Sequence, residues 1–141
     1  MISFNYENDF ILGNEDVYSS WISNIIVSEN KTEGDINYIF CNDDFLLNIN
    51  QQYLNHDTFT DIISFDYSVV NELHGDIFIS TERVSENATE FGVSFQNELL
   101  RVMAHGVLHY CGYKDKTESD EQIMRSKEDD KINMFHVERD V

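Results

Sequence analysis

An apolar run that begins near Phe95 ends in two histidines, His105 and His109, which lie four residues apart. On a helix this spacing places both imidazoles on one face, one turn apart, so that both can point a ring nitrogen at the same metal ion. Gly112 follows, and glycine adopts the positive φ with which helices commonly end. A reversal of the chain there brings Asp115 back toward the histidines. The segment therefore predicts an open transition-metal site at the end of a central helix, with ligands His105, His109 and Asp115.

Two alternatives to this ligand set stay open. The two histidines can face the core or the solvent without binding a metal. If Asp115 is a solvated loop residue, Glu118 or Asp120 can supply the oxygen ligand instead. Cys111 is expected on the opposite side of the helix, so it is not counted as a ligand.

The same segment resembles the signature of the YbeY family, metal-dependent endoribonucleases implicated in the maturation of ribosomal RNA. That signature reads His-Gly-x-Leu-His-x-x-Gly-Tyr-Asp-His. The residues that match it are His105, Gly106, Leu108, His109, Gly112 and Tyr113. Its last two positions differ, because Lys114 replaces the aspartate and Asp115 replaces the third histidine. The resemblance implies that Asp115 stands where relatives have their third ligand.

Two more segments extend the resemblance over roughly residues 35–117. Leu47-Asn48, Tyr53 and Thr60–Phe65 follow the family's order Leu-Asn, Tyr-Arg and Pro-Thr-Asp-Val-Leu-Ser-Phe, and Gly75–Ser80 is similar to its Gly-Asp-Ile-x-Ile-Ser strand. The arginine of that order falls at Leu54 here, and its proline falls at Phe59. Leucine cannot hold a phosphate, so if that arginine binds RNA in relatives, this protein binds RNA through other residues or less well.

Lys114 and Lys116 are the first substrate-binding candidates, because they flank Asp115 and are expected at the mouth of the metal site. His56, in the polar turn before Thr60, is expected on the substrate side. Less specific candidates are Arg83 and Arg101, which as lone cations are more often solvated surface charges, and His74, which is expected to line the same cleft.

The overall charge sets a limit on how such a protein can bind RNA. Only 9 lysines and arginines oppose 27 acidic residues, which gives a net charge of −18. Nucleic-acid binders usually neutralise phosphates with a basic face. An RNA enzyme of this composition therefore needs a local basic patch, the charge of its metal, or a partner that delivers the RNA.

The length of 141 residues suits one domain, residues 1–141, and a hydrophobic content of 41% is sufficient for one core. Cys41 and Cys111 match no zinc-finger spacing, so free thiols in a reducing cytosol are expected. No signal peptide and no run of ~20 apolar residues is present, which predicts a soluble cytoplasmic protein without membrane contact.

The hydrophobic pattern predicts an α+β fold in which a small mixed four-stranded sheet packs with about five helices. Thr32–Gly34 is expected to be a loop, Ser68–His74 a connection, and the chain after Phe135 a charged tail. The expected strands are Ile2–Tyr6, Asp35–Cys41, Asp61–Tyr67 and Gly75–Ser80. The expected helices run from Asn14 or Asp16 to about Ser28, from Asp44 to about Tyr53, over Thr81–Phe91, from the Ser94 cap to the His motif, and from Thr117 or Ser119 to about Phe135.

Three protein ligands leave a position for water on a Zn²⁺-like ion, whose charge makes hydroxide available near neutral pH. No protein base is assigned, and Gly106 stands where a zincin peptidase has its catalytic glutamate. Together with this chemistry, the resemblance implies a zinc-dependent endoribonuclease, with Mn, Ni or Fe also open, that acts on ribosomal RNA with the small ribosomal subunit or ribosomal proteins as partners and not on DNA. The alternatives are a non-catalytic, metal-stabilised ribosome-assembly factor and a metallohydrolase of another substrate.

Overall fold

The computed structural model describes residues 1–53 and 60–139. Its four strands form one mixed sheet in the order β1-β2-β4-β3, in which β1, β2 and β4 run parallel and β3 pairs antiparallel with β4. The predicted small mixed sheet is confirmed. The strands are β1 (Ile2–Tyr6), β2 (Thr32–Cys41), β3 (Ile62–Asp66) and β4 (Glu72–Ser80).

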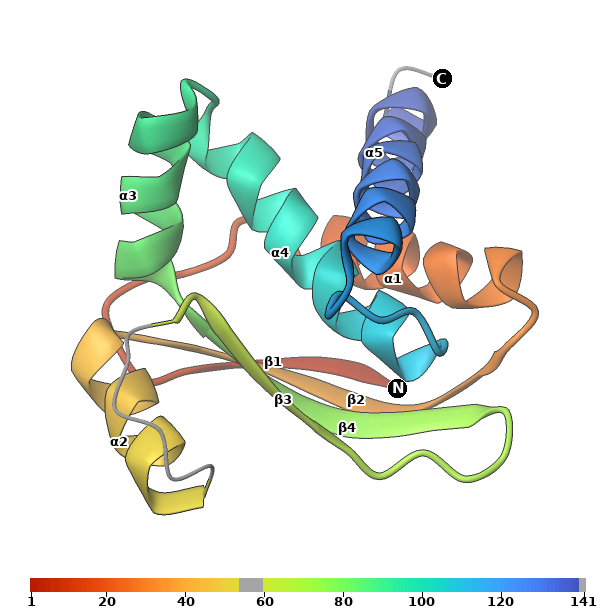
Figure 1. Ribbon diagram of the computed structural model, residues 1–141, viewed down its shortest axis with the longest axis horizontal. Coiled ribbons are helices and arrows are strands. Elements are labelled where there is room, and N and C mark those ends of the chain that lie inside the picture. Colours follow the sequence, from red (N-terminus) through yellow and green to blue (C-terminus); the bar gives the residue numbers. More distant parts are fainter. Residues whose placement is uncertain (54–59, 140–141) are drawn as a thin grey trace.

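Four helices lie on one face of the sheet and one helix lies on the other (Figure 1). The four are α1, α3, α4 and α5, and α2 is the helix on the opposite face. The predicted α+β class with about five helices is thus confirmed. The helices are α1 (Glu15–Ser28), α2 (Asp43–Tyr53), α3 (Thr81–Phe91), α4 (Phe95–Tyr110) and α5 (Glu118–Arg139).

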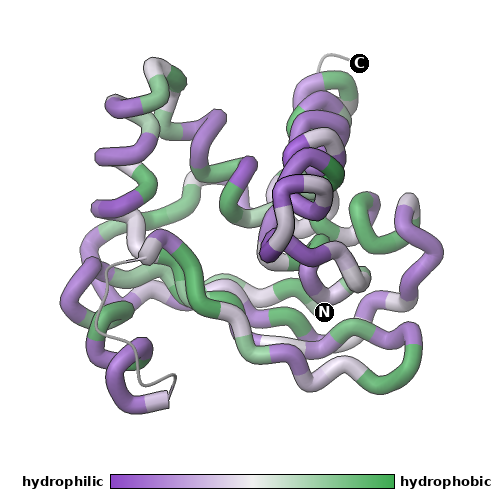
Figure 2. Tube along the Cα trace, in the orientation of Figure 1, coloured by the Kyte–Doolittle hydropathy of each residue, from purple (hydrophilic) through white to green (hydrophobic). Residues whose placement is uncertain are grey.

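Alternation along the strands divides the buried residues between the two faces. In β2, Ile36, Tyr38 and Phe40 belong to the main core beneath α1, α4 and α5, whereas Cys41 belongs to a small cluster with Leu46 of α2. Figure 2 shows the result in hydropathy, with apolar and polar residues interleaved along the strands and a largely hydrophilic α5 on the outside. Both cysteines are free thiols, as predicted.

Helix α4 is held firmly over the sheet, and this fixes the position of both histidines. Ser94 caps the helix by accepting a hydrogen bond from the backbone N–H of Asn97 at 3.0 Å, as the sequence predicted. The buried Tyr38 hydroxyl donates to the carbonyl of Met103 at 2.8 Å. At the other end of α4, Tyr110 donates its hydroxyl to the carbonyl of Phe65 on β3 at 2.8 Å.

Three expected boundaries are wrong, and at the first two the pairing of β2 with β4 extends the strands beyond their sequence pattern. Thr32–Gly34 is not a loop but the first part of β2, where Thr32 pairs with Glu72. The connection before Gly75 is accordingly shorter, since β4 begins at Glu72. The region after Phe135 is not a tail, because α5 continues to Arg139. In the described parts of the chain, no helix has the length and apolar character needed to cross a bilayer.

Candidate metal centre

His105 and His109 extend from the last turns of α4 toward one point, as their spacing predicts. Their Nε2 atoms lie 2.9 Å apart. The Oδ2 atom of Asp115 lies 3.1 Å from Nε2 of His105 and 3.3 Å from Nε2 of His109. The structure therefore brings together all three residues that the sequence predicts as ligands, with donor atoms within 4.8 Å of one another.

A turn at Gly112 carries Asp115 back to the histidines. The chain leaves α4 through Cys111, and Gly112 follows at φ +105°, a conformation that side chains other than glycine rarely adopt. The N–H of Tyr113 returns to the carbonyl of Leu108 at 3.2 Å, which closes the turn. The positive φ of Gly112 therefore allows the turn that brings Asp115 to the histidines.

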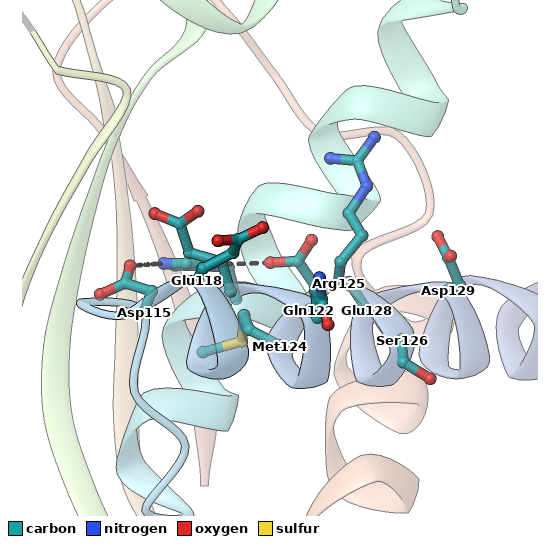
Figure 3. A pocket seen from close by; sticks show the side chains of 10 residues that line it. Asp115, Glu118, Gln122, Met124, Arg125, Ser126, Glu128 and Asp129 are labelled. Atoms are coloured by element: carbon teal, nitrogen blue, oxygen red, sulfur yellow. Dashed lines mark hydrogen bonds and ion pairs between the residues drawn. The ribbon is translucent and has the colours of Figure 1, made fainter.

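Each histidine is oriented through its Nδ1 atom. Nδ1 of His105 donates to Oε2 of Glu128 at 2.7 Å, and Nδ1 of His109 donates to the carbonyl oxygen of Tyr113 at 2.9 Å. Both partners only accept hydrogen bonds, so Nδ1 carries the proton and Nε2 is left with a lone pair. His105 thus lies between Asp115 at its Nε2 atom and Glu128 at its Nδ1 atom, and Figure 3 labels these two carboxylates.

This donor set fits a metal ion. Two Nε2 lone pairs and a carboxylate oxygen face one another, an arrangement that repels unless a cation lies between them. Ligands of a tetrahedral zinc ion lie about 3.3 Å from one another, close to the separations seen between Asp115 and the histidines. Glu128 and Tyr113 supply the outer hydrogen bonds that metal-binding histidines usually make.

A proton is the other cation that can occupy this position. Burial lowers the pKa of His105, but the hydrogen bond to Glu128 and the charge of Asp115 outweigh that effect, and the pKa is raised. A field that favours a proton also favours a divalent cation at the same place. Metal binding therefore competes with protonation at this site.

The remaining predicted site residues lie in different environments. Lys114 and Lys116 flank Asp115 and are exposed, but neither lines the pockets at the metal centre. His56, together with Leu54 and Phe59, lies outside the described residues. The expectation that His74 lines the same cleft is wrong, because it borders a separate pocket with Tyr67 and Val69.

Two predicted alternatives for the oxygen ligand can also be placed. Glu118 and Asp115 line the same pocket, but Glu118 is not part of the group of converging donor atoms. Asp120 is not part of this group either. Among the described residues, only His105, His109 and Asp115 form such a group. The geometry therefore favours Asp115 over both alternatives.

Two pockets adjoin the metal centre, and carboxylates are prominent in both. The inner pocket, of about 480 Å³, lies between α3, α4, α5 and the start of β3. It is lined by both histidines and by Asp61, Glu98 and Glu128. The outer pocket, of about 700 Å³, runs along α5 from Asp115 and Glu118. Burial raises the pKa of Asp61, as it raises that of Glu98. Asp61 thus lies on the wall of the inner pocket.

Glu128 is the functional residue that the sequence interpretation missed. It is only 5% exposed, and it accepts from Nη1 of Arg101 at 3.0 Å in addition to His105. Its spacing holds a signal, since Met124, Glu128, Ile132 and Phe135 share one buried stripe of α5. A carboxylate on an apolar stripe indicates a buried cationic or hydrogen-bonding partner. Arg101, expected to be a solvated charge, is instead such a partner.

A single-domain α+β fold with a His-His-Asp group above the sheet defines the class, a small domain with a candidate metal site. The sequence profile of the family described as endoribonuclease YbeY matches residues 3–136. The chain belongs to this family. The family prediction made from the sequence is therefore confirmed, and with it the prediction of an endoribonuclease.

Individual relatives agree with this assignment. An endoribonuclease YbeY from Flavobacterium psychrophilum is 66% identical over 99% of both chains. Another from Flavobacterium johnsoniae is 65% identical over 99% of this chain and 100% of the relative. The solution structure of TM1509 from Thermotoga maritima is similar with a TM-score of 0.69 at 26% identity, covering 98% of this chain and 91% of that chain.

Proposed function

We propose that this protein is a zinc-dependent endoribonuclease that hydrolyses phosphodiester bonds during ribosomal RNA maturation in the cytoplasm. The observation that carries the proposal is the convergence of His105, His109 and Asp115 with both histidine Nδ1 atoms already engaged. Membership of the YbeY endoribonuclease family supports the reaction, and the two-nitrogen, one-oxygen donor set supports zinc over harder ions.

The residues of the chain have distinct roles in this proposal. Zinc, when bound, supplies Lewis acidity toward a phosphoryl oxygen and activates water near neutral pH. His105, His109 and Asp115 hold the ion, and their three donors leave one tetrahedral position open. Glu128 keeps the imidazole of His105 in its ligating orientation, and Arg101 in turn holds Glu128.

The test is to measure metal content and RNA cleavage on the same preparations. Wild type purified without chelator is expected to carry one zinc ion per chain by elemental analysis and to cleave ribosomal RNA until a chelator is added. Asp115→Ala is expected to lose most of both, whereas Asp120→Ala, a matched loss of one carboxylate, retains them. Metal retained equally by both variants would remove Asp115 from the ligand set, and elemental analysis would also identify Mn, Ni or Fe.

The charge of the protein favours one second candidate, a metal-stabilised ribosome-assembly factor without catalysis. A net charge of −18 suits contacts with basic ribosomal proteins better than direct contacts with RNA. Stable binding to small ribosomal subunits, with metal bound but without chelator-sensitive cleavage, would support this candidate over the nuclease.

A further inference from the structure

We propose that Arg125 is a substrate-binding residue that holds an RNA phosphate beside the metal centre. The inference rests on the proposed function and names a further residue of the same site. It is carried by the position of Arg125 on α5, by its freedom from ion pairs, and by the acidic walls of the pockets that it borders.

Arg125 borders both pockets at the metal centre. In the inner pocket it lines the wall together with His105, His109 and Asp115, and in the outer pocket it lies with His105 and Asp115 again. Figure 3 shows its side chain rising from α5 between Glu118 and Asp129. Arg125 is thus shared by the two pockets that reach the predicted ligands.

Three other cations of α4 and α5, Arg101, Lys127 and Lys131, are already bound to carboxylates, and the exposed Lys114 and Lys116 line neither pocket. Arg101 binds Glu128 and Asp129 at 3.0 and 2.7 Å. Lys127 and Lys131 bind Glu29 at 3.2 and 2.8 Å. Among the residues that the structure describes, Arg125 has no ion pair within 4.0 Å, so its charge is available to a ligand.

The inner pocket requires such a charge if an anion is to enter it. Asp61, Glu98, Asp115 and Glu128 all line it, and carboxylates repel a phosphate. The metal offsets part of that repulsion at the reacting group, and Arg125 is a cation free to offset it at a neighbouring phosphate. A guanidinium also suits this role because it binds two phosphate oxygens at once.

The experiment compares Arg125→Gln, Arg125→Lys and Lys31→Gln with wild type. Lys31 is the control for the loss of one positive charge, since its Nζ donates to Asn71 at 3.2 Å and it borders none of these pockets. Fluorescence anisotropy measures binding to a short labelled phosphorothioate oligoribonucleotide, which resists hydrolysis, over a range of salt concentrations. Cleavage of the unmodified RNA gives kcat and KM, and elemental analysis gives metal content.

Arg125→Gln is expected to weaken RNA binding about tenfold at low salt, because a charge-assisted contact is lost. The slope of log affinity against log salt concentration should fall by about 0.7, the value for one phosphate contact on a single strand. KM should rise more than kcat falls, and metal content should not change. Arg125→Lys should keep the salt slope, because the charge remains, but bind more weakly than wild type.

The outcomes separate this inference from the proposed function. If Arg125→Gln matches Lys31→Gln in affinity, slope and KM while wild type cleaves RNA until chelated, Arg125 does not bind phosphate and the nuclease stands. If wild type does not cleave but its RNA binding depends on Arg125, the nuclease fails and the phosphate site stands. If wild type neither binds nor cleaves RNA, both are wrong.

Discussion

The buried carboxylate of Glu128 accepts two hydrogen bonds, one from His105, a proposed metal ligand, and one from Arg101. The hydrogen bond from His105 favours the tautomer of this histidine that carries its proton on Nδ1, which leaves Nε2 free to bind a metal, and it keeps the ring from rotating. The outer partners of metal-binding histidines typically contribute about 10- to 100-fold in metal affinity. The carboxylate is therefore expected to contribute to metal affinity although it is not one of the proposed ligands.

Glu128→Gln is expected to weaken zinc binding by about tenfold, since the amide keeps a weaker acceptor for Nδ1 of His105. Competition with a chromophoric chelator measures this affinity without relying on catalysis. Asp129→Asn is the matched control, because Asp129 also binds Arg101 but does not contact His105. Equal zinc affinities for the two variants would show that Glu128 only stabilises the fold.

The packing of α4 on the sheet depends on two glycines that differ in what surrounds them. A Cβ at Gly75 of β4 would overlap the Tyr110 hydroxyl and the carbonyl oxygen of Phe65. These atoms hydrogen-bond to each other and cannot move apart freely. A Cβ at Gly106 of α4 would meet the Cδ1 atoms of Ile77 and Ile62 at 3.0 and 3.1 Å, which are the ends of flexible side chains.

Gly75→Ala is therefore expected to reduce the free energy of unfolding by about 2–3 kcal/mol, the cost of overpacking with a broken hydrogen bond. Gly106→Ala should change it by less than about 1 kcal/mol, because the higher helix propensity of alanine offsets the shift of the isoleucine tips. Urea unfolding of the two variants and wild type measures both values. A larger loss in Gly106→Ala than in Gly75→Ala would contradict this account of the interface.

Glu29, which directly follows α1, links the first helix of the chain to the last helix, α5. Its carboxylate accepts from Lys131 and Lys127 of α5 at 2.8 and 3.2 Å and from the Tyr113 hydroxyl at 2.6 Å. The side chain of Glu29 is 8% exposed and that of Lys131 is 6% exposed. The same Tyr113 holds His109 through its carbonyl, so this network connects α1 and α5 to the metal centre.

Burial raises the pKa of Glu29, but the hydrogen bonds from Lys131, Tyr113 and Lys127 outweigh it and lower the pKa from 4.5 to about 2. A folded-state pKa below the unfolded one stabilises the protein above the unfolded pKa, and this stability is lost as the pH falls through the folded pKa. Glu29→Gln is therefore expected to lower the free energy of unfolding by about 2–3 kcal/mol at pH 7.

The pH dependence separates this effect from a simple loss of packing. The difference in unfolding free energy between wild type and Glu29→Gln should shrink as the pH falls from about 4.5 toward 2, as Glu29 of the wild type becomes protonated. Urea titrations at pH 7 and at two acidic pH values measure it. A difference that stays constant over this range would show that the charge of Glu29 contributes nothing.

Local patterns were sufficient for most of the secondary structure. Alternation in Ile36–Phe40 and the Ser94 cap identify β2 and α4 because strand and helix periods are properties of neighbouring residues. Strand ends such as Thr32 and Glu72 could not be predicted in this way. These residues extend the sheet because they pair with each other across 40 positions of the chain.

The candidate metal centre likewise has some features that local sequence sets and others that only tertiary packing sets. His105 and His109 share a face because one helical turn separates them, and Gly112 permits the turn that returns Asp115, so the sequence by itself determined the convergence of these three residues. Only the tertiary structure decided that Glu128 and Arg101 stand behind His105 and that Arg125 faces the pocket. His105 and Arg101 lie on α4, whereas Glu128 and Arg125 lie on α5, so their positions relative to one another depend on how α5 packs against α4, which no local spacing specifies.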